Sequence, residues 1–273
     1  MKSRFLGLRP RNDRTARGGS SPDCHPERSE GPAFQPSPNA GLHVALIPDG
    51  NGRWAQAQGL ARSAGHRAGA EVVGRIVEAA ARLGLGTLTL YAFAHYNWRR
   101  PPEEVARLMQ LFLTFLRAHT ATLAGHGGRL TVLGRRDRLS PELREAVETA
   151  EAATARGPNL HLRLAIDYSS REAIVEAARR LEGGSAADFA RLVAGDAPDV
   201  DFLIRTGGEL RLSDFLLWEC AYAELYFTST LWPDFTAGEF EAALENFRRR
   251  ERRFGRLPAA TLAREGGADG LRP

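Results

Sequence analysis

The chain has 273 residues, of which 43% are hydrophobic and 26% charged, and its formal net charge is +4. This balance is typical of a globular domain with one sizeable core, and it does not discriminate between anionic substrates, nucleic acid and a membrane surface. No apolar run approaches the roughly 18 residues of a membrane span. Cys24 and Cys220 lack metal-binding spacing, which argues against structural zinc and favours a reduced, cytoplasmic compartment.

Almost all of the basic charge is arginine, and Lys2 is the only lysine. Because Lys2 lies at the amino terminus, a P-loop lysine, a Schiff-base lysine and a lysine general base are all excluded. Any phosphate would have to be bound by arginine, histidine, backbone N–H groups and a metal ion.

Residues 1–40 are rich in Arg, Ser, Pro and Gly and have no periodic apolar pattern, so we expect a disordered tail and no secretory signal. The stretch 24–31 resembles translated repetitive non-coding sequence, which leaves a start codon further downstream as an alternative. We expect one folded domain at residues 41–258 and a flexible tail at 259–273.

From residue 42 on, short apolar runs alternate with helical patterns, which indicates an α/β fold with a central, mostly parallel β-sheet flanked by helices. The predicted strands are 42–47, 85–93, 129–133, 160–168, 202–205 and 225–227. The predicted helices are 65–83, 102–123, 141–155, 170–181, 213–222 and 236–253. Ligands bind at the carboxyl ends of the strands in such a sheet, so we expect the chemistry to follow Ile47, Phe93, Tyr168 and Arg205.

A glycine-containing segment, Asp49-Gly50-Asn51-Gly52-Arg53-Trp54, directly follows the first predicted strand. The glycines allow a tight turn whose N–H groups face an oxyanion, although a plain strand-to-helix turn remains an alternative. The run from Gly50 to Ala55 also matches a dinucleotide-binding pattern. Its acidic partner would be Glu71, inside a helix, which argues against that chemistry.

Charged residues around this segment point to a diphosphate. Asp49 would repel a diphosphate unless a divalent cation lay between them, which makes it a candidate Mg²⁺ ligand. Arg62, His66 and Arg67 fall near the start of the first long predicted helix, where the helix dipole favours anions. Each alone would be a solvated surface charge, but together with the loop they favour diphosphate binding.

Two further clusters follow later strands. In residues 91–101, a core aromatic cluster would explain Trp98 and its aromatic neighbours, whereas Asn97 and Arg100 are harder to explain by packing. In residues 201–213, paired glycines lie among side chains that would form a second diphosphate site, namely Arg205, Arg211 and Ser213. Glu224 is a second candidate metal ligand. A capped helix with structural ion pairs is the alternative for this third cluster.

Together the three clusters resemble the cis-prenyltransferase family, and in particular its undecaprenyl diphosphate synthases. The resemblance covers nearly all of residues 43–255. It is carried by the run 43–55, by Asn97-Trp98 with Arg100-Pro101, by 204–209 with Arg211 and Ser213, and by 215–218, 223–227 and 231–235. The DDxxD motif of the trans-prenyltransferases is not found in the sequence.

The resemblance implies an enzyme that extends an allylic diphosphate, commonly farnesyl diphosphate, with isopentenyl diphosphate units through new cis double bonds. It implies an apolar tunnel for the growing chain and a product that serves as lipid-carrier precursor for cell-wall glycans. A shorter-chain cis-prenyl diphosphate synthase and a weakly active partner subunit are the alternatives.

The resemblance also assigns roles by position. The allylic diphosphate is expected to bind Gly50, Asn51, Gly52, Arg53, Arg62 and His66, with Trp54, Trp98 and Arg100 also in the substrate site. Isopentenyl diphosphate is expected to bind Arg205, Arg211 and Ser213. Asp49 and Glu224 are expected to hold Mg²⁺. Asp49, His66 and Asn97 are the catalytic candidates, and the proton acceptor stays open between Asp49, His66 and the released diphosphate.

The expected assembly is a homodimer in which Arg253-Phe254-Gly255 reaches the partner's active site. We also expect peripheral contact with a membrane during product release. We expect no nucleic acid as partner, because the arginines of 248–253 are interrupted by Glu251 and explained by the terminal helix.

Several positions depart from the family pattern. Pro48 stands where methionine is usual, and Ala94-His95-Tyr96 replaces Ser-x-Glu. The run 167–170, Asp-Tyr-Ser-Ser, replaces Asn-Tyr-Gly-Gly, Asp214 replaces an asparagine, and Ile166 is bulkier than the common alanine. The segment 181–201 is shorter than usual, so we expect a trimmed helix there. These changes leave catalytic efficiency and product length open.

Overall fold

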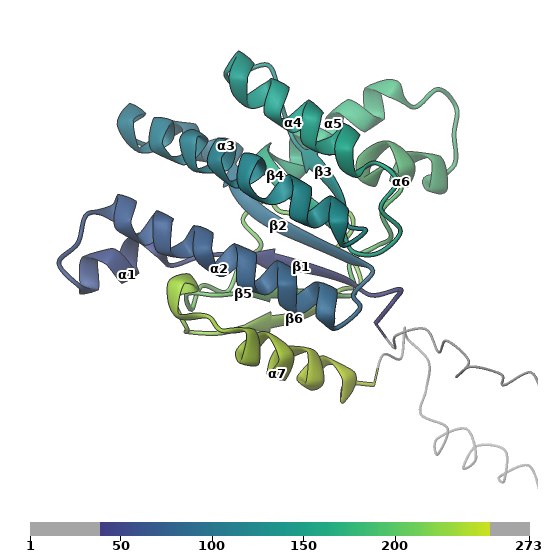
Figure 1. Ribbon diagram of the computed structural model, residues 1–273. Coiled ribbons are helices and arrows are strands. Elements are labelled where there is room, and N and C mark those ends of the chain that lie inside the picture. Colours follow the sequence, from purple (N-terminus) through teal and green to yellow (C-terminus); the bar gives the residue numbers. More distant parts are fainter. Residues whose placement is uncertain (1–38, 252–273) are drawn as a thin grey trace, which may run out of the picture. The chain divides into compact units, whose positions relative to one another are not determined.

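The computed structural model describes residues 39–251. In this part of the chain six strands form one sheet in the order β3-β4-β2-β1-β5-β6, and every neighbouring pair is parallel (Figure 1). The strands are β1 (His43–Ile47), β2 (Thr87–Ala94), β3 (Arg129–Leu133), β4 (His161–Tyr168), β5 (Phe202–Arg205) and β6 (Glu224–Phe227). The predicted α/β fold with a mostly parallel sheet is therefore confirmed.

Helices cover both faces of this sheet. The α-helices are α1 (Asn51–Ala57), α2 (Arg62–Arg82), α3 (Pro102–Gly125), α4 (Pro141–Thr154), α5 (Ser170–Arg180), α6 (Ala186–Ala194) and α7 (Ala237–Arg248), and short 3-10 helices occupy η1 (His95–Arg99) and η2 (Trp232–Asp234). Side chains of α2, α3, α4 and α7 pack into the core on one face, while α5 lies over the other with α6 beside it. Local signals set several starts: Ser140 caps α4 ahead of a proline, and Thr236 forms a capping box at α7.

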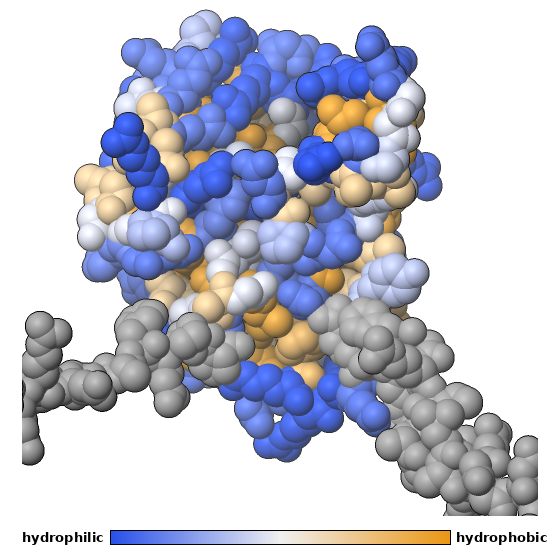
Figure 2. All heavy atoms as spheres, turned by 90° about the vertical axis from the view of Figure 1, so that its right-hand side faces the viewer, coloured by the Kyte–Doolittle hydropathy of each residue, from blue (hydrophilic) through white to orange (hydrophobic). Residues whose placement is uncertain are grey.

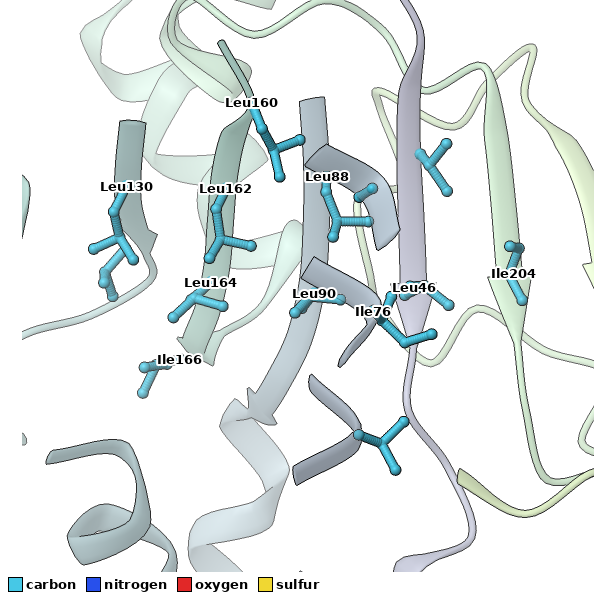
Figure 3. Close-up of a cluster of buried hydrophobic side chains, with 14 of the residues drawn as sticks. Leu46, Ile76, Leu88, Leu90, Leu130, Leu160, Leu162, Leu164, Ile166 and Ile204 are labelled. Atoms are coloured by element: carbon cyan, nitrogen blue, oxygen red, sulfur yellow. The ribbon is translucent and has the colours of Figure 1, made fainter. Parts of the chain in front are cut away.

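The core explains why the strands read as continuous apolar runs. All five residues of β1 are buried, because a central parallel strand has a helix layer on each side. Leu46 packs with Ile76 of α2 and with the leucines of β2 in the larger cluster (Figure 3). Ala45 points to the opposite face, toward Phe215. The rigid β1 therefore fixes the position of the residues that follow it.

Two local predictions differ in kind from the structure. The predicted helix 213–222 is wrong, since the structure has turns there, and Ser213, Asp214 and Leu216 take positive φ angles that a right-handed helix excludes. Helix α1 was expected as a loop, but Gly50 precedes a helix that begins at Asn51. The segment 181–201, where a trimmed helix was expected, contains α6, which has nine residues.

The predicted tails, residues 1–40 and 259–273, lie outside the described residues except for Asn39 and Ala40, and so does the run 253–255. Within residues 39–251 no helix is both long enough and apolar enough to cross a membrane. Figure 2 shows the side from which the strands start, and hydrophilic side chains cover most of its described surface. The predicted chemistry lies at the other end of the sheet.

Burial of His43 predicts a pH-dependent stability. Its ring is fully buried and contacts the Pro198 carbonyl oxygen at 2.8 Å and the Thr89 hydroxyl at 2.7 Å. Burial lowers the pKa of His43 from 6.5 to about 4. The unfolded chain therefore binds a proton between pH 6.5 and 4 that the folded chain does not. The contribution of His43 to the free energy of unfolding should be fully present above pH 6.5. It should fall as the pH is lowered through this window, by about 3 kcal/mol at most.

The measurement is the thermal unfolding midpoint from pH 7.5 to 4, for the wild type and for His43→Gln. We expect the variant to lose less stability over this range, since glutamine cannot gain a charge. Equal pH slopes for the two proteins would contradict the assignment.

Candidate functional site

The site begins where β1 ends. Gly50 has φ +113°, a backbone conformation that other residues rarely adopt, and it lets the chain turn from β1 into α1. The Thr206 hydroxyl accepts a hydrogen bond from the Asp49 N–H at 2.9 Å and donates one to the Asp49 carbonyl oxygen at 2.8 Å. The Trp232 N–H also donates to this carbonyl, at 3.0 Å. The main chain of Asp49 is thus held on both sides.

The Asp49 carboxylate lies between two arginines. Arg205 Nη2 donates to its Oδ2 at 2.9 Å, and Arg53 Nη2 lies 3.2 Å from its Oδ1. Burial acts to raise the pKa of this carboxyl, but the hydrogen bond and charge of Arg205, aided by Arg53, outweigh burial and hold the pKa below its usual value. Asp49 is therefore an anion at neutral pH and remains about one third exposed.

Arg205 connects Asp49 to the segment that follows β5. It is the last residue of β5, is only 3% exposed, and pairs in register with Ile47 of β1. Its Nη1 donates to the Ser213 hydroxyl at 2.8 Å and to the carbonyl oxygen of Arg211. The three residues predicted to bind a second diphosphate are therefore in contact, because the buried guanidinium of Arg205 contacts both Ser213 and Arg211.

A chain of charges continues outward from this point. Arg53 Nη1 donates to the Gly207 carbonyl oxygen at 2.7 Å and lies 3.8 Å from Glu209. Glu209 also pairs with Arg211. Arg53 and Arg211 are both largely exposed, so they can change partners when an anion arrives.

A second group of cations lies between α2 and α3, around Glu104. This carboxylate contacts Arg62 at 3.2 Å, His66 at 3.1 Å and Arg100 at 3.4 Å. Arg62 lies against the start of α1, since a Cβ on Gly52 would overlap its guanidinium. The structure therefore brings the predicted allylic-diphosphate residues together with the glycine-containing segment.

The pKa values in this group reflect its burial and charge. Burial lowers the pKa of His66 despite its hydrogen bond with Glu104. Burial acts to raise the pKa of Glu104, but the hydrogen bonds from Arg62 and His66 outweigh it and lower the pKa. At neutral pH a single carboxylate thus faces two arginines, which leaves a net positive charge for an anion.

A cleft of about 340 Å³ opens beside this group, between α2 and α3. Charged side chains, including Arg62, His66 and Glu104, form one part of its wall. Leu108 and Leu111 of α3 contribute apolar surface along the same helix face. A charged region next to apolar surface suits a ligand with an anionic head and a hydrocarbon tail.

Three predicted site residues have other contacts in the structure. Trp54 donates its indole N–H to Asp234 at 2.7 Å and so ties α1 to η2. The Asn97 side-chain oxygen accepts a hydrogen bond from the Ala94 N–H at 3.0 Å, at the start of η1. Trp98 packs edge-on against Phe93 in the core. For Trp98 the packing interpretation that the sequence left open is thus observed.

The predicted pairing of Glu224 with Asp49 on one metal ion requires correction. Glu224 is the first residue of β6 and is in register with Phe202, at the amino end of β5, whereas Asp49 follows the carboxyl end of β1. At about 3.3 Å per residue along a strand and about 4.8 Å between strands, the two residues are roughly 19 Å apart. Glu224 instead pairs with Arg250 at 2.8 Å. Within one chain they cannot ligate the same ion.

Whether the site can hold a divalent cation therefore depends on the carboxylate of Asp49. Across the described part of the chain, no three His, Cys, Asp or Glu side chains are grouped so that they could hold a metal ion. Mg²⁺ typically needs only one or two carboxylates when substrate phosphates supply further oxygens. The charged, partly exposed oxygens of Asp49 fit this requirement at the junction of the two cation groups.

Two site features were not predicted from the sequence. Glu104 was missed because an acidic residue in the first turn of a helix is ordinary, and Glu103 beside it has the same signal. The ion pair of Arg138 with the fully buried Asp167 was also missed. Arg138 lies over the Trp98 ring at 5.1 Å and 2.9 Å from His95 Nδ1, so this pair packs against η1. Twenty-nine residues separate the two partners in sequence, and no local pattern joins them.

Comparisons with known proteins agree on one family. The model of a family described as putative undecaprenyl diphosphate synthase matches residues 47–255. Isoprenyl transferase 1 of Bradyrhizobium diazoefficiens is 56% identical over 223 residues, which are 80% of this chain and 91% of that protein. The isoprenyl transferase of Aquifex aeolicus is 48% identical over 79% of this chain and 96% of that protein.

Solved structures give the same result. Lavandulyl diphosphate synthase from Lavandula x intermedia, solved in complex with dimethylallyl diphosphate, superposes with a TM-score of 0.76 at 34% identity, over 80% of this chain and 98% of that one. A probable undecaprenyl diphosphate synthase from Campylobacter jejuni superposes with a TM-score of 0.67 at 32% identity, over 78% and 98%.

The contacts of Glu104 predict that it competes with anionic ligands. Replacing it by glutamine removes the negative charge that now partly neutralises Arg62 and Arg100. We expect Glu104→Gln to bind inorganic pyrophosphate more tightly by several-fold, on the order of 1 kcal/mol. Isothermal titration calorimetry measures this, with Glu103→Gln as the matched control, since Glu103 is exposed and, among residues 39–251, its ion pair is with Arg107. Unchanged or weaker binding by Glu104→Gln would contradict the prediction.

Proposed function

Because the chain belongs to the undecaprenyl diphosphate synthase family of isoprenyl transferases, as its motifs predict, we propose that it condenses farnesyl diphosphate with isopentenyl diphosphate to a cis-polyprenyl diphosphate. The proposed product is the lipid-carrier precursor for cell-wall glycan synthesis. One observation supports this reaction above others: the site has two groups of cations, one around Glu104 and one that pairs with Asp49, and each can hold one diphosphate.

In this proposal the allylic diphosphate binds at the group around Glu104. Arg62, His66 and Arg100 exchange the carboxylate of Glu104 for phosphate oxygens, and Gly50 to Arg53 approach from the start of α1. Arg62 is at the first position of α2, whose first turn holds no acidic residue, so the helix dipole adds to the attraction. The hydrocarbon tail follows Leu108 and Leu111 into the cleft.

Isopentenyl diphosphate binds at Arg205, Arg211 and Ser213 in the same proposal. Arg205 is held in place by β5 and by Asp49, so it pays little conformational entropy on binding. Arg211 is exposed and contributes a second guanidinium when it leaves Glu209. Ser213 is exposed and adds a hydroxyl beside them.

Asp49 lies between the two diphosphates and is the proposed Mg²⁺ ligand. A bound Mg²⁺ would stabilise the negative charge that grows on the departing diphosphate. The arginines on the same side stabilise that charge too, and more strongly as the allylic bond breaks. Asn97 and His66 remain the other catalytic candidates, and His66, neutral because of its lowered pKa, can accept a proton.

A shorter allylic substrate is the second candidate. The similarity to lavandulyl diphosphate synthase, whose crystals contain dimethylallyl diphosphate, supports it, and the cleft of about 340 Å³ is small for a long product. A homodimer is the proposed assembly, because β6 is an edge strand that contains the exposed Leu225, and the exposed Tyr222 lies just before this strand in sequence. A cytoplasmic protein in peripheral contact with a membrane is the proposed location.

The test is incubation with radiolabelled isopentenyl diphosphate and Mg²⁺, with either farnesyl or dimethylallyl diphosphate, followed by chromatography of the products. We expect incorporation that stops on chelation by EDTA and returns with added Mg²⁺. Asp49→Ala should lower the rate at least about 100-fold, because it removes the metal ligand and the partner of Arg205. No incorporation with either allylic substrate, or equal rates for Asp49→Ala and wild type, would contradict the proposal.

A further inference from the structure

The segment 213–217 after β5 has a backbone conformation that needs external support. Ser213, Asp214 and Leu216 have φ angles of 52°, 66° and 45°, in the left-handed region where residues other than glycine are uncommon. Ser213 is exposed, whereas Phe215 and Leu216 are buried. The segment thus has a buried end in the core and an exposed end beside Arg205.

Hydrogen bonds from the start of α5 supply this support. The Ser169 hydroxyl donates to the Asp214 carboxylate at 2.6 Å, and the Arg171 N–H donates to the other carboxylate oxygen at 3.0 Å. The Ser170 N–H donates to the Asp214 carbonyl oxygen at 3.0 Å, and the Leu217 N–H donates to the Ser170 hydroxyl at 2.9 Å. We call Ser169, Ser170 and Asp214 the α5 latch.

The α5 latch is placed to control Ser213. Asp214 follows Ser213 directly, so fixing the main chain and side chain of Asp214 fixes the position of the Ser213 hydroxyl. The Tyr91 hydroxyl donates to the Ser213 carbonyl oxygen at 3.2 Å and holds the same residue from β2. Ser213 in turn contacts Arg205, which contacts Asp49. Hydrogen bonds on both sides of the Asp214–Ser213 peptide bond therefore connect α5 to the site.

The contact between Ser169 and Asp214 depends on the chemistry of both side chains. The Ser169 hydroxyl is a hydrogen-bond donor to the Asp214 carboxylate that a glycine could not provide. Asp214 also brings a negative charge to the amino end of α5, where the helix dipole favours it.

We propose that Ser169 and Asp214 are positioning residues for isopentenyl diphosphate, because they fix the Ser213 hydroxyl beside Arg205 before the substrate binds. This inference rests on the proposed function, since it takes Ser213 and Arg205 as the site of that substrate. Neither Ser169 nor Asp214 touches the substrate in the proposal. Loss of either side chain should therefore weaken the binding of isopentenyl diphosphate and leave the binding of the allylic substrate unchanged.

The experiment compares KM for isopentenyl diphosphate with KM for the allylic substrate in Asp214→Ala and Ser169→Ala. We expect KM for isopentenyl diphosphate to rise about tenfold in both variants, because a tenfold change corresponds to the loss of roughly one hydrogen bond. KM for the allylic substrate should be unchanged. Asp214→Asn should recover most of the affinity, because an amide can accept from the Arg171 N–H and donate to the Ser169 hydroxyl.

A double variant tests whether Asp214 acts through Ser213. If it does, Ser213→Ala and Asp214→Ala combined should raise KM for isopentenyl diphosphate no further than Ser213→Ala alone. Asp188→Ala is the matched control, since Asp188 forms the same serine–aspartate pair with Ser185 at the exposed start of α6. It should leave both KM values unchanged. Partial unfolding of a variant lowers the active fraction and not KM, so the readout does not depend on stability.

Equal rises in both KM values, unchanged values in Asp214→Ala, or additive effects in the double variant would overturn the inference. The wild-type assay separates this from failure of the proposed function. A wild type that incorporates no isopentenyl diphosphate overturns both, whereas an active wild type with unaffected variants overturns the inference alone.

Discussion

The ion pair between Asp49 and Arg205 is the contact on which the rest of the site depends. It joins the carboxyl ends of two adjacent strands, β1 and β5, across 2.9 Å. Arg205 is almost fully buried, so the loss of Asp49 would leave a charged group in the interior with fewer partners, which is costly. Because Arg205 also holds Ser213 and the Arg211 carbonyl, the pair sets the geometry of the segment after β5 as well as that of α1.

Carboxylates form ion pairs with the arginines of the site when no ligand is bound. Glu104 lies among Arg62, His66 and Arg100, while Asp49 and Glu209 lie among Arg53, Arg205 and Arg211. Such a site is folded and its arginines are partly neutralised before the substrate arrives, so each diphosphate has to displace a carboxylate or share its cations. The carboxylates thus keep the arginines positioned at the expense of some anion affinity.

Much of this arrangement could be predicted from the sequence, because it follows from local patterns. The apolar run before Asp49 predicts a buried strand, and topology places residues after parallel strands at one edge, which brings Asp49 and Arg205 together. Contacts between distant side chains gave no such signal. Glu104 could not be distinguished from Glu103, and Glu224 was paired with Asp49 because strand register is not visible in sequence. The turn at 213–217 resembles a helix in composition, and its positive φ angles are stabilised by hydrogen bonds to α5, Tyr91 and Arg205, which are distant in sequence.

The most direct test of the account is a crystal structure with isopentenyl diphosphate, Mg²⁺ and a non-reactive analogue of farnesyl diphosphate. The account predicts one diphosphate between Arg62, His66 and Arg100, the other against Arg205, Arg211 and Ser213, and the metal ion on Asp49 between them. Glu104 should have moved away from at least one of its cations. Two diphosphates bound at one of these groups, or a metal ion away from Asp49, would contradict it.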